Sequence, residues 1–169
     1  RTQNHIANAD ITPLEKLSFI GKRGMGALEF EPSTSQTLSS HSNIDIASLS
    51  HLAQKIYQQK EALHLIPEES LTMQSLIALG TSAGGRQPKA IIAINKVTQE
   101  IRSGQIVGLE GFENYILKFG EAERSSAEIE MSYFERARKA GINISDSELW
   151  QIEGINHFLT KRFDRSEGN

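Results

Sequence analysis

Cysteine is absent from the 169 residues of this chain, and proline and long apolar runs are scarce. Without cysteine there is no disulfide framework, no thiolate nucleophile and no cysteine zinc site, which suits a reducing compartment such as the cytoplasm. Four prolines and 13 glycines are too few for a collagen-like or low-complexity protein. The longest aliphatic run, 90–94, is far shorter than the roughly 20 residues of a membrane-spanning helix.

Neither positive nor negative charge predominates in the chain. The chain carries 18 basic and 21 acidic side chains, a net charge of −3, which is too even for a surface that wraps nucleic acid or adheres to an anionic membrane. Its 38% apolar and 23% charged residues are typical of a globular protein with a core. Because the sequence starts at Arg1, without Met or an apolar leader, we expect a fragment of a longer protein and no secretory signal.

Hydrophobic periodicity predicts an α+β fold, with a mostly antiparallel sheet and flanking helices. The expected elements, in chain order, are strands at 17–20 and 27–30, helices at 45–57 and 68–79, strands at 89–95 and 112–119, a helix from Ser125 or Ser126 to about Ala140, and a hairpin that pairs 148–152 with 156–163 across Glu153 and Gly154. A Ser- and Thr-rich loop at 33–43 is the expected joint between two parts of the chain.

A glycine-bearing loop, 81–88, precedes the strand at 89–95. Adjacent Gly84 and Gly85 would let a ligand approach the backbone closely and could direct successive N–H groups into one concavity that binds phosphate. Ser82 and Arg86 could add a hydroxyl and a fork of donors. Because the loop is neither a Walker A nor a GxGxxG motif, an ordinary helix-to-strand turn is the alternative interpretation.

Lys118 lies near the end of the apolar strand predicted at 112–119. A lone lysine in this position usually extends its ammonium group to solvent. The functional interpretation requires a carboxylate on the following helix, where Glu128 and Glu130 are both candidates. A strand lysine paired with a helix glutamate is the arrangement with which protein kinases hold the phosphates of ATP.

The last predicted strand ends in Arg162-Phe163-Asp164-Arg165. The run is short and contains an acidic residue, so an internal ion-pair cluster is favoured over a nucleic-acid patch. The sequence contains no HExxH motif, no pair of histidines four residues apart and no GxSxG elbow. These absences exclude the familiar zinc-protease and serine-hydrolase signatures.

Taken together, these segments resemble the HipA family of bacterial serine/threonine protein kinases, which are the toxins of type II toxin–antitoxin pairs. The matching blocks, in the family's order, are 17–21 with 23–32, Ser82–Ala90, Tyr115–Lys118 with Glu130 and 140–142, and His157–Leu159 with Lys161–Arg165. The resemblance implies a remnant of an N-terminal subdomain with a linker at 1–43 and an ATP-binding N-lobe at 44–169.

The resemblance also implies roles for particular residues. The phosphate-covering loop would consist of Ser82, Ala83, Gly84, Gly85, Arg86 and Gln87. Ser82 would be a regulatory autophosphorylation site, because a phosphate there would repel those of ATP and eject the loop. Lys118 would contact the ATP phosphates, and Glu130 would hold Lys118 in place.

The family's catalytic aspartate and magnesium ligands follow the Arg-Phe-Asp-Arg block, whereas this sequence ends at Asn169. We therefore expect no catalytic residue, no metal ligand and no helical C-lobe in this chain. The parent kinase would use ATP and Mg²⁺ to phosphorylate a protein of translation, which in the family is an aminoacyl-tRNA synthetase. Its partner would be a helix-turn-helix, HipB-like antitoxin, with no membrane or direct nucleic-acid contact. The alternative is a non-catalytic interaction module or split subunit that docks a partner protein.

Overall fold

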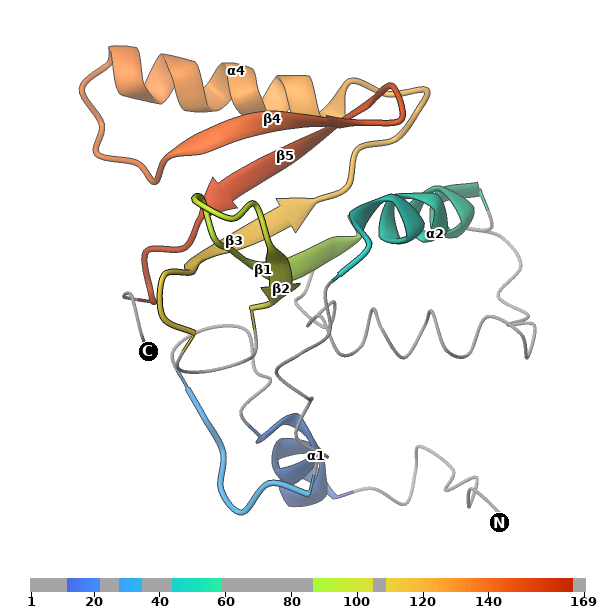
Figure 1. Cartoon of the computed structure of the whole chain (residues 1–169), viewed down its shortest axis with the longest axis vertical. Coiled ribbons are helices and arrows are strands. Elements are labelled where there is room, and N and C mark those ends of the chain that lie inside the picture. Colours follow the sequence, from blue (N-terminus) through green and yellow to red (C-terminus); the bar gives the residue numbers. More distant parts are fainter. Residues whose placement is uncertain (1–11, 22–27, 35–43, 59–86, 105–108, 166–169) are drawn as a thin grey trace.

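A computed structural model describes residues 12–21, 28–34, 44–58, 87–104 and 109–165. Its centre is a five-stranded antiparallel sheet with the order β2-β1-β3-β5-β4 (Figure 1). The strands are β1 (Lys89–Ile94), β2 (Ile101–Ser103), β3 (Glu113–Lys118), β4 (Ser147–Ile152) and β5 (Ile155–Lys161). The helices are α1 (Pro13–Ile20), α2 (Ile46–Gln58) and α4 (Ser126–Lys139). The expected α+β fold with antiparallel pairing is confirmed.

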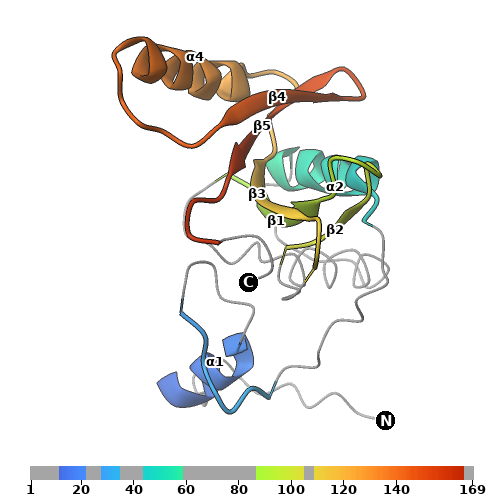
Figure 2. The ribbon, with the colours of Figure 1, turned by 60° about the vertical axis from the view of Figure 1, so that its left-hand side comes forward.

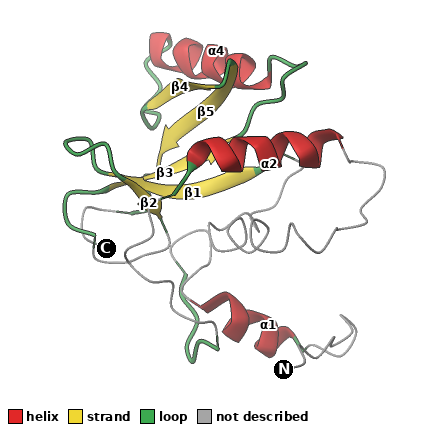
Figure 3. Cartoon of the chain, turned by 45° about the vertical axis from the view of Figure 1, so that its right-hand side comes forward, coloured by secondary structure: helices red, strands yellow, loops and turns green. Residues whose placement is uncertain are grey.

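Helices α2 and α4 pack on opposite faces of the sheet, as Figure 3 shows. On one face, Leu49 and Leu52 of α2 are buried against Ile92 and Leu117 of the central strands. Burial of each such side chain stabilises the fold by about 1.5–3 kcal/mol. On the other face, α4 packs on β5 and β4 through a smaller apolar cluster, made of Ala127, Met131, Phe134, Leu149 and Phe158.

The predicted helix after Asp45 is confirmed as α2. The Asp45 side chain accepts hydrogen bonds from the Ala47 N–H at 3.0 Å and from the Ser48 hydroxyl at 2.5 Å. These bonds satisfy a backbone donor that the first turn would otherwise leave unpaired, which is why an aspartate stabilises this position. The same bonds hold the pKa of Asp45 below its ordinary value.

The predicted C-terminal elements are also confirmed. Helix α4 begins after Ser125 and is followed by Gly141, whose φ of +78° is the left-handed conformation that ends many helices. Strands β4 and β5 form a hairpin in which Glu153 and Gly154 have φ values of +51° and +81°. Two successive positive φ values match the twist of tight hairpins, so the turn chemistry locates this hairpin correctly.

The two short strands predicted near the N-terminus are wrong. Residues 17–20 belong to helix α1, and Leu28, Glu29 and Phe30 form no strand. The Thr12 side chain caps the Glu15 N–H, the Glu15 side chain binds the Thr12 N–H, and Pro13 occupies the first turn. This capping box nucleates a helix that overrides the β-like appearance of four apolar-rich residues. Helix α1 buries none of its residues and lies apart from the sheet in both Figure 1 and Figure 2.

Several predictions fall on residues that the structure does not describe. They are the helix at 68–79, residues 81–86 of the glycine loop, and most of the Ser- and Thr-rich loop at 33–43. Within the described ranges, no helix combines the length and the apolar character that crossing a membrane requires.

Candidate functional site

The structure brings Lys118 and Glu130 together in a hydrogen-bonded ion pair. Lys118 is the last residue of β3, and Glu130 lies on α4. The Lys118 ammonium nitrogen also lies 5.5 Å from the centroid of the Phe158 ring. The lysine side chain is partly exposed, with 31% of its surface accessible.

Only one of the two candidate carboxylates pairs with the lysine. The other, Glu128, accepts a hydrogen bond of 2.6 Å from the Asn156 side chain. Glu128 and Glu130 lie on different sides of the helix, because residues two apart in an α-helix differ by about 200° in direction. Helix geometry therefore separates the two carboxylates, one toward Lys118 and one toward the β4–β5 turn.

Strand alternation explains why Lys118 points toward α4. Side chains of a strand alternate between its two faces, so Ile116 and Lys118 share one face. Tyr115 and Leu117 lie on the other face, in the core beneath α2. The placement of an apolar residue two positions before the lysine gives this face both an apolar wall and a cation.

An open cavity of about 900 Å³ lies on the Lys118 face of the sheet. Ile116 and Thr160, which are direct cross-strand partners, line it from β3 and β5. The remaining wall comes from the α4–β4 loop and from the chain after β5, through Asn143, Ile144, Ser145, Asp146, Lys161, Arg162, Phe163 and Asp164. Pockets that bind cofactors have volumes of roughly 300–1,000 Å³ and combine apolar walls with a few polar groups.

Arg162 and Asp164 stiffen the cavity wall that follows β5. The Arg162 side chain is almost completely buried, and its guanidinium donates two hydrogen bonds to Asp164, of 2.9 and 2.6 Å. These bonds, together with the nearby positive charge, hold the pKa of Asp164 below its ordinary value. Arg165 also pairs with Glu29 at 3.4 Å. The internal ion-pair cluster predicted for this segment is therefore confirmed.

Gln87, the last residue of the predicted phosphate-covering loop, lies against the end of β3 that carries Lys118. Ser82, Ala83, Gly84, Gly85 and Arg86 lie outside the described residues, while Gln87 is described. The Gln87 side-chain amide donates to the Phe119 carbonyl at 3.1 Å, and the Phe119 N–H donates to the Pro88 carbonyl at 3.0 Å. Lys89 then pairs directly with Lys118 across the two strands. The chain that leaves the loop is thus attached to the end of β3 that carries Lys118.

Sequence reasoning missed a buried polar group beneath this site. His157 is fully buried, and its Nδ1 accepts a hydrogen bond of 2.9 Å from the Gly120 N–H. The Nε2 atom therefore carries the proton and donates to the Ser50 hydroxyl at 3.1 Å. Burial lowers the pKa of His157 to about 4, so the ring is neutral at physiological pH. Ser50 lies among the apolar positions of α2, and that was the available signal that it faces the core.

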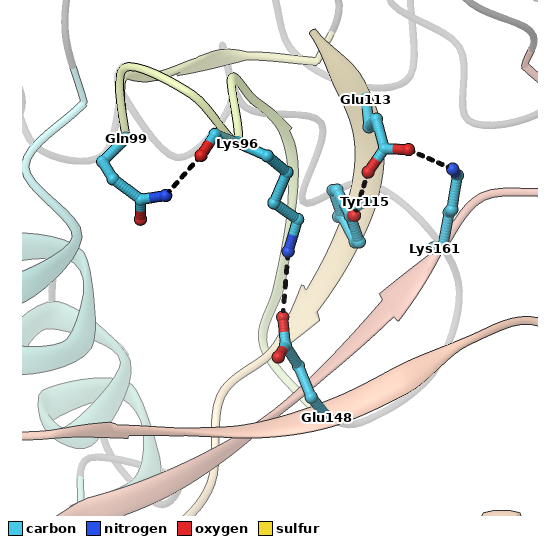
Figure 4. Close-up of polar contacts among 6 residues, drawn as sticks. All are labelled: Lys96, Gln99, Glu113, Tyr115, Glu148 and Lys161. Carbon is cyan, nitrogen blue, oxygen red and sulfur yellow. Dashed lines mark hydrogen bonds and ion pairs between the residues drawn. The ribbon is translucent and has the colours of Figure 1, made fainter.

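A second polar cluster occupies the opposite face of the sheet (Figure 4). Glu113 pairs with Lys161 and accepts a hydrogen bond of 2.5 Å from the Tyr115 hydroxyl, while Lys96 pairs with Glu148 at 3.3 Å. Burial, followed by the Glu113 hydrogen bond, raises the pKa of Tyr115. Each of the two cations is thus paired with one anion, and the pairs join β3 to β5 and the loop after β1 to β4.

Acidic residues and histidines do not gather into a metal centre anywhere in the described part of the chain: no three of them lie close enough to hold an ion. The Lys118 site offers an ammonium group and an apolar wall, an arrangement that suits an anionic ligand with a flat or apolar portion.

Comparison with known proteins identifies the family. Searches among curated proteins and among solved structures gave no match. The model of the HipA-like C-terminal domain matches residues 81–168, slightly more than half of the chain. This stretch contains the glycine loop, Lys118, Glu130 and the Arg162–Arg165 segment, whereas the resembling block at 17–32 precedes it. The chain therefore belongs to the family of proteins with a HipA-like C-terminal domain.

Proposed function

We propose that this chain is the ATP-binding lobe of a HipA-like serine/threonine protein kinase. The observation that carries the proposal is the Lys118–Glu130 ion pair beside the cavity lined by Ile116 and Thr160. Membership of the HipA-like family, which is related to kinases, supports the same assignment. The ammonium group of Lys118 would bind the phosphates of ATP, and the apolar wall would contact its adenine base.

In this proposal Lys118 holds the phosphates of ATP. A charge-assisted hydrogen bond from an ammonium group to a phosphate is roughly twice as strong as a neutral one. Glu130 holds the Lys118 side chain in one conformation, directed toward α4. Little side-chain conformational entropy is therefore lost when the nucleotide binds. Ile116 would contact the adenine ring, and the Thr160 hydroxyl, on the same wall, would form a hydrogen bond with it.

We further propose that the loop from Ser82 to Gln87 covers the phosphates, with Gly84 and Gly85 permitting close approach of the backbone. Phosphorylation of Ser82 would then regulate the site by charge repulsion. Mg²⁺ bound with ATP supplies positive charge that offsets the phosphates. Because the family's magnesium ligands follow the Arg162–Arg165 block, we propose that they lie elsewhere in the parent protein.

For the parent kinase we propose transfer of the γ-phosphoryl group to a serine on a protein of translation, such as an aminoacyl-tRNA synthetase, in the cytoplasm. A helix-turn-helix antitoxin of the HipB type would be the regulatory partner. These proposals follow from the family resemblance, and the Lys118 site supports them only by offering a place for ATP.

Calorimetric titration of the chain with Mg²⁺-ATP tests the proposed function. We expect binding to the wild type and affinity reduced about tenfold or more in Lys118→Ala, since a hydrogen bond to a charged group contributes roughly 1.5–3 kcal/mol. Lys96→Ala is the matched control, because Lys96 lies on the opposite face of the sheet and should leave affinity unchanged. Wild-type protein that binds no ATP at millimolar concentration, or a Lys118→Ala variant with full affinity, would contradict the proposal.

A second candidate function is a non-catalytic module that docks a partner protein. Two large apolar side chains on α4 favour it, because Ile129 and Tyr133 are 56% and 70% exposed and lie one helical turn apart. The same calorimetry separates the candidates, since a docking module needs no affinity for ATP.

A further inference from the structure

The backbone N–H and carbonyl of Gly120 are held by side chains from two distant segments. Its carbonyl accepts a hydrogen bond of 2.7 Å from the Gln54 side chain, and its N–H donates to His157 at 2.9 Å. The Gln54 side-chain oxygen also accepts a bond of 3.2 Å from the Ala122 N–H. Ser50 completes the arrangement by contacting His157 at 3.1 Å. We call Ser50, Gln54 and His157, arranged around Gly120, the Gly120 clamp.

The Gly120 clamp lies on the connection between the two residues of the ion pair. Gly120 follows Lys118 by two residues, and the connection from β3 leads directly into α4, which carries Glu130. Helix α4 itself packs mainly on β4 and β5. The position of Glu130 relative to Lys118 therefore depends both on this packing and on how the connection leaves β3.

One face of helix α2 contacts the connection between β3 and α4. Ser50 and Gln54 are four residues apart, so they project from the same side of the helix, beside the buried Leu49 and Ala53. Gln54 is suited to the task because its amide can donate and accept at once, and it does both, to Gly120 and from Ala122. No other side chain type of the same length offers both bonds.

We propose that Gln54 is a positioning residue for Lys118: by holding the peptide groups of Gly120 and Ala122 it sets the path from β3 to α4 and so maintains the Lys118–Glu130 pair. The inference goes beyond the proposed function, because α2 precedes the segment matched by the family model. It rests on the proposed function only where ATP affinity is the quantity measured.

The first test measures the lysine without any nucleotide. The chain is acetylated with an amine-reactive ester, and the rate at each lysine is read by mass spectrometry. The Gln54→Met variant keeps the side-chain length and loses the hydrogen bonds to Gly120 and from Ala122. We expect Lys118 to be acetylated roughly two- to fivefold faster in this variant, because a partly exposed ion pair protects the amine only modestly. Glu130→Gln sets the upper limit. Lys96, on the opposite face, should react at an unchanged rate.

Gln99→Met is the matched control variant. Gln99 also donates a side-chain hydrogen bond to a backbone carbonyl, that of Lys96 at 2.7 Å, but in the loop between β1 and β2. This variant should leave the Lys118 rate unchanged. If Gln54→Met does not fold, Gln54→Glu replaces it, because the carboxylate retains the acceptor for Ala122 and loses the donor to Gly120.

The second test is a double-mutant cycle on ATP affinity. If Gln54 acts through Lys118, Gln54→Met should weaken binding severalfold in the wild-type background and have no further effect in Lys118→Ala. An unchanged Lys118 rate in a folded Gln54 variant would overturn the inference, as would an equal increase at Lys96, which indicates general loosening. A selective increase at Lys118 in a chain that binds no ATP would support the positioning role and reject the proposed function.

Discussion

A β-carbon added to Gly120 would lie 2.0 Å from the carbonyl oxygen of Asn156. The chain leaving β3 thus passes directly against the start of β5, with no room for any side chain. The Asn156 amide also donates to Glu128 in the first turn of α4. The end of β3, the β4–β5 hairpin and the beginning of α4 therefore meet at one point, two residues from Lys118.

Gly120→Ala should destabilise the fold, because the new methyl group collides with a backbone atom that cannot rotate away. Overpacking of this kind costs about 1–3 kcal/mol or more. Chemical unfolding in urea measures the loss. Gly141→Ala is a suitable comparison, since its added β-carbon meets nothing within 4 Å and suffers only from a φ of +78°, which costs about 1–2 kcal/mol. Equal stability of the Gly120→Ala variant and the wild type would refute the close packing.

Glu130→Gln should leave the fold stable and weaken ATP binding severalfold. The Lys118–Glu130 pair is partly exposed, and such pairs contribute about 1 kcal/mol or less to stability. The loss of affinity would come from a lysine that is no longer held toward its ligand. Thermal unfolding and calorimetry check the two halves of this expectation. Glu135→Gln, an exposed position on the same helix, serves as the control, and an equal effect there would argue against a specific role of Glu130.

The stability of the chain should fall as the pH drops from about 6.5 to 4, because of His157. Burial lowers the pKa of His157 from its ordinary 6.5 to about 4. Between these pH values the histidine is therefore protonated in the unfolded state and neutral in the folded state. Stability therefore rises with pH across the window, by roughly 3 kcal/mol at most for a shift of this size. Below pH 4 both states are protonated and the slope from this group disappears.

The measurement is the free energy of unfolding in urea at several pH values. His157→Gln should flatten the slope between pH 4 and 6.5. Asp164 and Glu113 have lowered pKa values, so the stability they contribute is lost as the pH falls below their ordinary values of 3.8 and 4.5, and Glu113 therefore overlaps the lowest part of the His157 window. An identical slope in His157→Gln would show that another group titrates.

Ser82→Asp should weaken ATP binding in the full-length parent protein. The reason is the proposed role of the glycine loop, in which a negative charge at position 82 would oppose the phosphates. Calorimetry against the wild type measures the change. Ser125→Asp is the control, because it adds the same charge at the exposed residue preceding α4, where an aspartate suits a helix N-terminus. Unchanged ATP affinity in Ser82→Asp would remove the serine from the site.

Local sequence signals predicted correctly those helices, strands and turns in which such signals are strong. Asp45 marks the start of α2, the β-branched run of 89–95 marks β1, and Glu153 with Gly154 marks the hairpin turn. The failure at 17–20 has an equally local cause. The capping box of Thr12 and Glu15 precedes those residues, and four residues of a strand-like pattern cannot outweigh a nucleated helical turn.

The sequence by itself determined the α+β class, the alternation that places Ile116 and Lys118 on one face, and the two carboxylates that could reach the lysine. Only the tertiary structure decided that Glu130 binds Lys118 while Glu128 binds Asn156, and that α2 holds Gly120 through Gln54. The physical reason is the range of the interactions. Strand alternation and helix capping act between neighbours, whereas Gln54 and Gly120 meet only after the sheet has formed and two helices have packed on its opposite faces.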